Sequence, residues 1–237
     1  MKTSNKILLG IFLAIILLTT TVQLMVYAKY NRGAYVTFQR DKIIKLASIK
    51  VPTTRFVSLK NLGNCMLVNS DTSRFEVDED KARNISYRVV NDTLIICGDT
   101  TLTADQLERG ERNHELVIIF LPAAIQVNAT SSNIYINGTV DSVHAPSYNI
   151  HLLKRSELSI REQWQKPEGA GYFNRLLINS EFSTISLEDH IIVNDLNITL
   201  ALNSGMDNNN ATIRKMALEM DSDSKITLSG NSIKALK

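Results

Sequence analysis

Four charged residues recur every twenty positions in the C-terminal half of the 237-residue chain: Arg155, Arg175, Asp195 and Lys215. If they stack on successive turns of a repeating fold, the three cations could neutralise the carboxylate of an acidic sugar, as polysaccharide cleavage requires. Asp195 interrupts the row, however, and mixed charges are ordinary on a solvent-exposed face. We therefore take Arg155, Arg175 and Lys215 as candidate ligand-binding residues and predict no catalytic residue.

Short strand-like runs share this spacing and would have to position the charges. Repeats of 20 to 22 residues on such runs are what the stacked turns of a β-solenoid require. An antiparallel sandwich with strands every ~8–12 residues would also bring every second strand near twenty. We favour the solenoid, with three predicted columns: Leu158, Ile178, Ile198 and Leu218; Ile185, Met206 and Ile226; and Ile191, Ile213 and Ile233.

Composition limits the function classes. The net charge of +2 is too small to indicate nucleic-acid binding. The chain has no Gly-rich phosphate loop and no Gly-x-Ser-x-Gly nucleophile elbow. The histidines show no spacing typical of a zinc site; they are His114, His144, His151 and His190. We predict a protein that is not an enzyme and that binds no metal or other cofactor.

The N-terminus carries a run of twenty-two uncharged residues, residues 7–28, after a six-residue tail. At ~1.5 Å per residue a helix of this length reaches ~33 Å, enough to cross a bilayer core of ~30 Å. Lys2 and Lys6 before the run also fit a cleavable signal peptide, although its apolar part is usually only ~7–15 residues. We expect a single-pass transmembrane anchor, with the domain that follows it exported to the periplasmic side of the cell membrane. Lys29 and Arg32 after the run nearly balance the charges before it. The expected orientation therefore depends on the observation that exported β-solenoids commonly carry an N-terminal anchor.

Residues 29–54 are expected to form a juxtamembrane linker, and residues 55–237 one β-rich domain. Within that domain, residues 116–121 are a continuous apolar run that fits a strand buried on both faces. Cys65 and Cys97 are an even pair that could form a disulfide in an oxidising compartment. Both also lie in strand-like runs, where buried free thiols are common.

Several segments of this domain match one pattern. FEVDED (residues 75–80) precedes ISYRVVNDTLIICGD (residues 85–99), and LVIIFLPAAIQVNATSSNIYING (residues 116–138) precedes short strands with Ser-Gly or Asn-Gly turns. This pattern resembles the putative auto-transporter adhesin, head GIN domain family of Gram-negative bacteria, from about residue 55 to the C-terminus. The usual Ser-Gly-Ala turns are reduced here to Ser204-Gly205 and Ser229-Gly230, with Asn137-Gly138 in a similar role.

The resemblance implies an exported, right-handed parallel β-helix-like domain that is often held at the membrane. We therefore predict an all-β solenoid behind an N-terminal transmembrane helix, acting as a non-catalytic scaffold or adhesin-like module for an unknown protein or glycan. Two alternatives remain: a carbohydrate-active enzyme that uses the charged column, and an envelope-sensing module.

Overall fold

The computed structural model describes residues 3–31, 45–98, 106, 113–123, 125–161, 170–229 and 232. The chain forms two compact units, residues 1–43 and residues 44–237, which we describe separately. Helix α1 (Thr3–Asn31) contains the uncharged run of the first unit. The hydroxyls of Thr20 and Thr21 each donate to a carbonyl oxygen one turn earlier at 2.7 Å, so these polar residues are accommodated within the helix. Among the described residues no helix is both long enough and apolar enough to cross a membrane, and the predicted span at residues 7–28 is not confirmed.

The second unit consists of two large β-sheets, which we call sheet A and sheet B. Sheet A contains, in spatial order, β1 (Leu46–Lys50), β4 (Arg74–Asp78), β7 (Asn113–Leu121), β3 (Leu62–Asn69), β9 (Asn133–Asn137), β11 (Glu157–Arg161), β13 (Thr184–Leu187), β15 (Gly205–Asn208) and β18 (Lys225–Thr227). Sheet B contains β16 (Thr212–Ile213), β14 (Ile191–Ala201), β12 (Gly171–Glu181), β10 (Ser147–Leu153), β8 (Gln126–Thr130), β2 (Phe56–Lys60), β6 (Thr93–Gly98) and β5 (Ile85–Val90), with β17 (Met216–Met220) also beside β14. A short 3-10 helix, η1 (Glu79–Asn84), follows β4.

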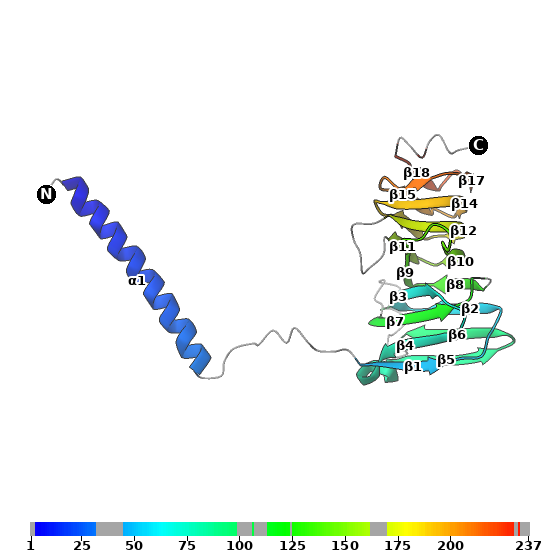
Figure 1. The fold of residues 1–237 in the computed structure, drawn as a ribbon, viewed down its shortest axis with the longest axis horizontal. Helices are drawn as coiled ribbons and strands as arrows, with labels where there is room; N and C mark the ends of the chain where they lie inside the picture. Colours follow the sequence, from blue (N-terminus) through cyan, green and yellow to red (C-terminus); the bar gives the residue numbers. More distant parts are fainter. Residues whose placement is uncertain are drawn as a thin grey trace. The chain divides into compact units, whose positions relative to one another are not determined.

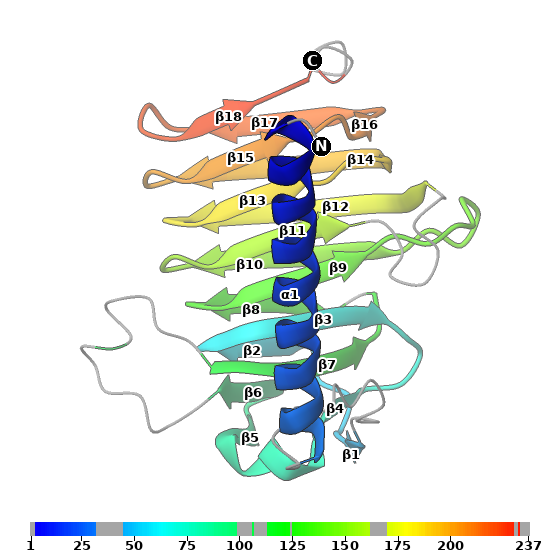
Figure 2. The same ribbon diagram turned by 90° about the vertical axis from the view of Figure 1, so that its left-hand side faces the viewer.

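From β8 to β15 the chain alternates between the two sheets, and from β10 onward each strand pairs in parallel with a strand one turn earlier. Strands β16 and β17 both lie beside β14 in sheet B before β18 returns to sheet A. Figures 1 and 2 show these strands stacked one above another. Alternate side chains point between the sheets, where Ile134, Ile150, Leu158 and Ile178 have no exposed surface. Period-two alternation on short strands therefore builds a continuous apolar core, because each strand buries one face against the opposite sheet.

The end of the stack that contains the first strands in sequence is built differently. Here β1 pairs with β4, β4 with β7, and β5 with β6, all antiparallel. Strand β3 lies between β7 and β9, its parallel neighbours in sheet A, rather than beside its neighbours in sequence. The all-β prediction is confirmed. A single right-handed parallel β-helix over residues 55–237 is not confirmed, because both sheets are mixed and do not close on each other.

The predicted columns are right in part. Ile178, Ile198 and Leu218 are register partners in sheet B, as predicted. Leu158 is instead in sheet A, where it pairs with Ile185 at the start of the second predicted column. In the second predicted column, Ile185 is the register partner of Met206, and Met206 is the register partner of Ile226. The second column is therefore confirmed.

The third column is wrong where it can be checked. Ile191 pairs with Gly171, and Ile213 pairs with Val193, two residues further along β14. Ile233 lies outside the described residues. The spacing of 22 residues between Ile191 and Ile213 therefore does not correspond to one turn of the fold at this position.

Buried serines form a ladder at the corner where the chain passes from sheet B to sheet A. In each turn the backbone N–H of the serine donates to the hydroxyl oxygen of the serine one turn later. These bonds are Ser132 N to Ser156 Oγ at 3.2 Å, Ser156 N to Ser183 Oγ at 3.1 Å, Ser183 N to Ser204 Oγ at 3.3 Å and Ser204 N to Ser224 Oγ at 3.2 Å. All five serines are buried. The ladder satisfies backbone donors that the bend removes from the sheets.

The residue before each of the first four corner serines, Ser132, Ser156, Ser183 and Ser204, adopts a left-handed backbone conformation. Its φ is 49° at Ser131, 61° at Arg155, 50° at Phe182 and 63° at Asn203. This conformation is costly for most residues with a Cβ atom, and Asn tolerates it best after Gly. Arg155 and Phe182 are therefore held in place by the serine ladder and the strands on either side of the corner.

Candidate functional site

The charged column is only partly present in the structure. Arg175 and Asp195 are direct register partners in sheet B, and Arg175 Nε lies 3.6 Å from Asp195 Oδ2. Lys215 follows Ile213, the partner of Val193, and its carbonyl oxygen accepts a hydrogen bond from Leu196 N at 2.9 Å. Both members of the ion pair are about half exposed. This part of the column is an alternation of opposite charges on the outer surface.

Arg155 does not belong to this column. It lies at the corner after β10, where its N–H donates to the carbonyl of Phe182 at 2.7 Å. The register partner of Arg175 in β10 is Ser147 rather than Arg155. The twenty-residue spacing therefore does not bring Arg155 beside Arg175, and the structure does not assemble the three predicted cations on one face.

The cysteines are not bridged. Cys65 and Cys97 are both free, so the disulfide that the sequence left possible is not formed. Cys65 points into the core from β3, and burial raises the pKa of its thiol. Cys97 lies in β6 of sheet B. Within the described part of the chain, no three His, Cys, Asp or Glu side chains are grouped so that they could hold a metal ion.

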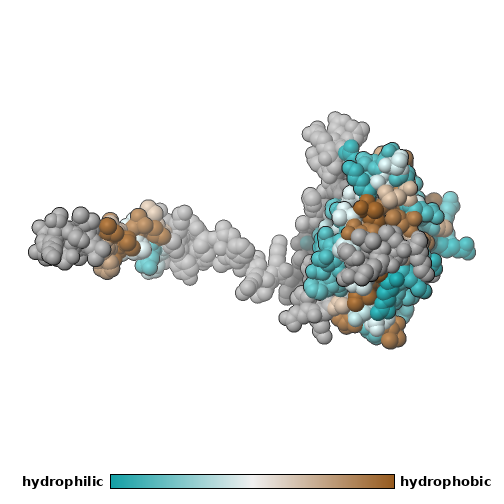
Figure 3. All heavy atoms as spheres, turned by 90° about the horizontal axis from the view of Figure 1, so that it is seen from above, coloured by the Kyte–Doolittle hydropathy of each residue, from teal (hydrophilic) through white to brown (hydrophobic). Residues whose placement is uncertain are grey.

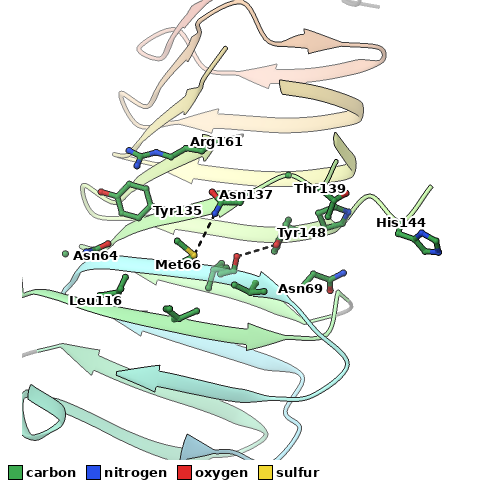
Figure 4. Close-up of a pocket in the computed structure, with 16 residues that line it drawn as sticks. Asn64, Met66, Asn69, Leu116, Tyr135, Asn137, Thr139, His144, Tyr148 and Arg161 are labelled. Carbon is green, nitrogen blue, oxygen red and sulfur yellow. Dashed lines mark hydrogen bonds between the residues drawn. The ribbon is translucent and has the colours of Figure 1, made fainter. Parts of the chain in front are cut away.

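A pocket of about 990 Å³ lies on the outer face of sheet A. Its floor comes from the outward-facing residues of three adjacent strands, β7, β3 and β9. Met66 is the register partner of both Ile118 and Tyr135, so these three side chains form a row across the sheet. Leu116 and Val68 extend the floor along the strands. Figure 4 shows Leu116, Met66 and Tyr135 on neighbouring strands.

An apolar floor is unusual at this place, because outward positions of a one-sided sheet are normally polar. Further along sheet A the same outward row continues as Ser159, Ser186, Asp207 and Thr227. Apolar outward residues are therefore concentrated on β7, β3 and β9. In the view along the stack in Figure 3, hydrophobic residues are interspersed with hydrophilic ones on the described surface.

The connection from β9 to β10 forms one wall of the pocket, with Pro146 and His144 among its lining residues. Thr139 N donates to Tyr172 O at 3.2 Å and Tyr172 N donates to Thr139 O at 2.8 Å, which fixes the start of this loop against β12. Gly138 is required here, because an added Cβ would lie only 2.6 Å from the carbonyl carbon of Gly171. The position of this wall therefore depends on the close approach of the backbone at Gly138 to the backbone at Gly171.

Arg161 and Tyr135 mark one end of the pocket. The guanidinium carbon of Arg161 lies 4.3 Å from the centroid of the Tyr135 ring, within the range of a cation–π interaction. Arg161 Nε also lies 2.9 Å from Glu188 Oε1. The positive charge at this end is thus paired with a carboxylate and stacked on an aromatic ring.

Polar groups lie along the rest of the rim. Asn137 Nδ2 lies 3.8 Å from Met66 Sδ and is held over the floor, as Figure 4 shows. His144 Nδ1 lies 2.6 Å from Asp141 Oδ2 on the exposed loop. The hydrogen bond with the His144 side chain is the main cause that lowers the pKa of Asp141. Both basic side chains of the described lining, Arg161 and His144, therefore lie beside an acidic side chain.

Tyr148 closes the pocket from β10. Its hydroxyl donates to the carbonyl of Leu67 at 3.4 Å, and its ring centroid lies 6.3 Å from that of Phe173. Burial raises the pKa of the Tyr148 hydroxyl, so it stays neutral at physiological pH. Tyr148 thus adds a neutral, hydrogen-bonded surface to the apolar floor.

The lining of the pocket is mainly apolar with a few hydroxyl and amide groups. Its described lining residues contain no serine or cysteine beside a histidine, and Thr139 donates its hydroxyl to the carbonyl of Asp141 at 2.9 Å. An apolar concave surface with a few convergent polar groups is typical of a small-molecule site.

Sequence reasoning missed the pocket, although one signal for it was present. The apolar run at residues 116–121 predicts a strand buried on both faces. The inward residues Val117, Ile119 and Leu121 are buried, but Ile118 and Phe120 face outward and are only partly covered. Ile118 lines the pocket, and Phe120 lies under the guanidinium of Arg74 at 3.6 Å. The continuous run therefore reflects an outward apolar surface as well as the core.

No protein-family model and no curated protein matches the chain. Among solved structures it is similar to a putative adhesin from Bacteroides fragilis NCTC 9343, at 12% sequence identity over 78% of this chain and 97% of that chain, with a TM-score of 0.38. It is also similar to a putative lipid binding protein from Parabacteroides distasonis ATCC 8503, at 12% identity over 77% and 80% of the two chains, with a TM-score of 0.33. A putative adhesin from Parabacteroides merdae ATCC 43184 has 11% identity over 78% and 96%, with a TM-score of 0.30. At these identities and TM-scores the similarities assign neither a family nor a function, and the family resemblance stays a prediction.

Proposed function

We propose that this protein is a non-catalytic binding module whose ligand site is the pocket on the outer face of sheet A. One observation carries the proposal: Leu116, Ile118, Met66 and Tyr135 present an apolar floor outward where the same sheet is otherwise polar. Exposing such a floor loses hydrophobic stabilisation, which a bound ligand would recover.

The polysaccharide-cleaving alternative is not favoured by the geometry. It requires Arg155, Arg175 and Lys215 on one face, and Arg155 lies at a corner beside Phe182 instead. Arg175 is itself paired with Asp195. A binding role needs only the shape and the lining of the pocket.

We also propose a family and a cellular location for the protein. The segments at residues 75–80, 85–99 and 116–138 support membership of the head GIN domain family, and hence an adhesin-like role with a protein or glycan partner. The uncharged run at residues 7–28 supports a membrane anchor and export of the domain. Protease added to intact spheroplasts should digest residues 44–237 if the domain is exported. Protection of the domain until the membrane is opened would contradict export and favour the sensing alternative.

The binding site itself is tested with N-phenyl-1-naphthylamine, a neutral dye whose fluorescence rises in apolar surroundings. We expect saturable binding to the full chain and a loss of about tenfold or more in affinity for Met66→Glu, because the new carboxylate would be desolvated by the bound dye. Met220→Glu is the matched control, since Met220 is a 42% exposed methionine on β17 of sheet B.

Circular dichroism of both variants checks that the fold is retained. Equal dye binding by the two folded variants would contradict the assignment of the site to sheet A. Absence of saturable dye binding to the unmodified protein would contradict the proposal as a whole.

A further inference from the structure

The charge balance of the pocket points to the class of ligand. We infer that the pocket selects a neutral amphiphile, an alkyl chain with an uncharged amide, hydroxyl or ester end, over the corresponding carboxylate. This inference depends on the proposed binding function. It follows from how the apolar floor, the neutral rim and the paired charges are distributed.

The apolar floor of the pocket would bind an apolar portion of the ligand. Strand β3 contributes lining residues from Asn64 to Asn69, a length of about 16 Å at ~3.3 Å per residue. Met66 and Val68 face outward between these two asparagines. On the neighbouring strand β7, Ile118 lies beside Met66 and Leu116 beside Asn64. An alkyl chain laid over this floor would replace exposed apolar surface with van der Waals contact.

The rim offers neutral hydrogen-bonding groups at both ends of the floor. Asn64 and Asn137 carry amides, each able both to donate and to accept, and Asn69 carries another at the opposite end of β3. Figure 4 shows Asn64 and Asn69 on opposite sides of Met66. A ligand amide, hydroxyl or ester can be satisfied by such groups without bringing a charge out of water.

The two basic side chains of the described lining, Arg161 and His144, each already lie beside a carboxylate. Arg161 is the one formally charged side chain of the described lining that stays cationic at all relevant pH, and its Nε contacts Glu188 at 2.9 Å. A ligand carboxylate beside Arg161 would therefore also meet the Glu188 carboxylate. His144 is in turn paired with Asp141 at 2.6 Å.

The test compares decanamide with decanoate, which have the same chain and head groups of similar shape, as competitors of the neutral dye. In the unmodified protein decanamide should displace the dye at about a tenfold lower concentration than decanoate, because an uncompensated carboxylate is costly to desolvate. In Glu188→Gln the cation of Arg161 loses its partner, so decanoate should gain at least several-fold while decanamide is unchanged. Glu181→Gln, a carboxylate on sheet B that pairs with His151, is the control and should alter neither competitor.

The outcomes separate this inference from the proposed function. If the dye binds but decanoate competes as well as decanamide, or if Glu188→Gln leaves their ratio unchanged, the ligand class is wrong and the site remains. If the dye does not bind at all, the proposed function fails, and the ligand class with it.

Discussion

Replacing one serine of the corner ladder should destabilise the turn before it as well as its own turn. Ser183 is 2% exposed, and its hydroxyl oxygen accepts the N–H of Ser156 at 3.1 Å. The same hydroxyl donates to the carbonyl of Glu181 at 2.8 Å. Ser183→Ala keeps the Cβ atom and the backbone but removes both bonds, so the N–H of Ser156 is left buried without an acceptor.

The expected loss follows from these two bonds. A buried donor without a partner costs about 1–3 kcal/mol of stability. A hydrogen bond between uncharged groups makes a net contribution to stability of about 1 kcal/mol. We therefore expect Ser183→Ala to lower the free energy of unfolding by about 2–3 kcal/mol. In a unit of this size, 1 kcal/mol shifts the Tm by about 2–4 °C, so the Tm should fall by roughly 4–12 °C. Ser186→Ala is the control, because Ser186 faces outward on β13 and should change the stability by less than about 0.5 kcal/mol.

The assay combines thermal unfolding with hydrogen–deuterium exchange read by mass spectrometry. In Ser183→Ala the peptide that contains Ser156 should exchange faster, although it is 27 residues away in sequence. Faster exchange confined to the peptide of residue 183, or a loss no larger than that of Ser186→Ala, would refute the ladder as a source of stability.

Three further predictions concern the corner backbone, the pocket wall and the buried tyrosine. Phe182→Gly should stabilise the protein by about 0.5–1 kcal/mol, because glycine adopts the φ of 50° at this exposed position without steric strain and loses only part of that gain to the higher entropy of the unfolded chain. Phe182→Ala keeps the Cβ atom that causes the strain, so it should give no gain in the same thermal assay. Gly138→Ala should weaken dye binding by several-fold, because its Cβ would collide with Gly171 and displace the wall, whereas Gly205→Ala meets nothing closer than 4.0 Å and should bind normally. Tyr148 keeps its proton more readily in the folded than in the unfolded state, so stability should fall as the pH rises above about 10, where the unfolded tyrosine ionises first. Urea unfolding from pH 8 to 11 should show a smaller loss of stability for Tyr148→Phe than for the unmodified protein.

The sequence predicted stacked β-strands correctly, but a fixed spacing did not assign each strand to its sheet. The serine ladder shows why, because its steps are 24, 27, 21 and 20 residues long. Where the step is 20 or 21, the spacing places Met206 beside Ile185 and Ile226 beside Met206 correctly. The 27-residue step follows Ser156, so twenty residues after Leu158 the chain is in sheet B rather than back in sheet A. The same insertion separates Arg155 from Arg175.

A better local signal was available in the serines themselves. In several turns a serine precedes an apolar–polar–apolar triplet, as in Ser156 before Leu158 and Ser183 before Ile185. The serine marks the corner whatever the length of the turn, because its hydroxyl must satisfy a buried N–H at that point. Aligning the turns on serine would have joined Leu158 to Ile185 directly.

The pocket could not have been predicted from spacing of any kind. Its floor requires β3 to lie between β7 and β9, an order that differs from the order along the chain. Met66, Ile118 and Tyr135 come from three separated segments and share a row only after this pairing forms. Hydrophobic periodicity identifies which face of a strand is apolar, but it does not identify the neighbouring strand.

Locating a bound ligand tests the central claim most directly. A neutral decanamide analogue with a photoreactive diazirine on its alkyl chain should be crosslinked to the full chain and mapped by peptide mass spectrometry. We predict labels in residues 63–69, 116–118 and 135–148, with strong loss of labelling in Met66→Glu and little change in Met220→Glu. Labels concentrated on the strands of sheet B, or labelling that is the same in both variants, would contradict a binding site on the outer face of sheet A.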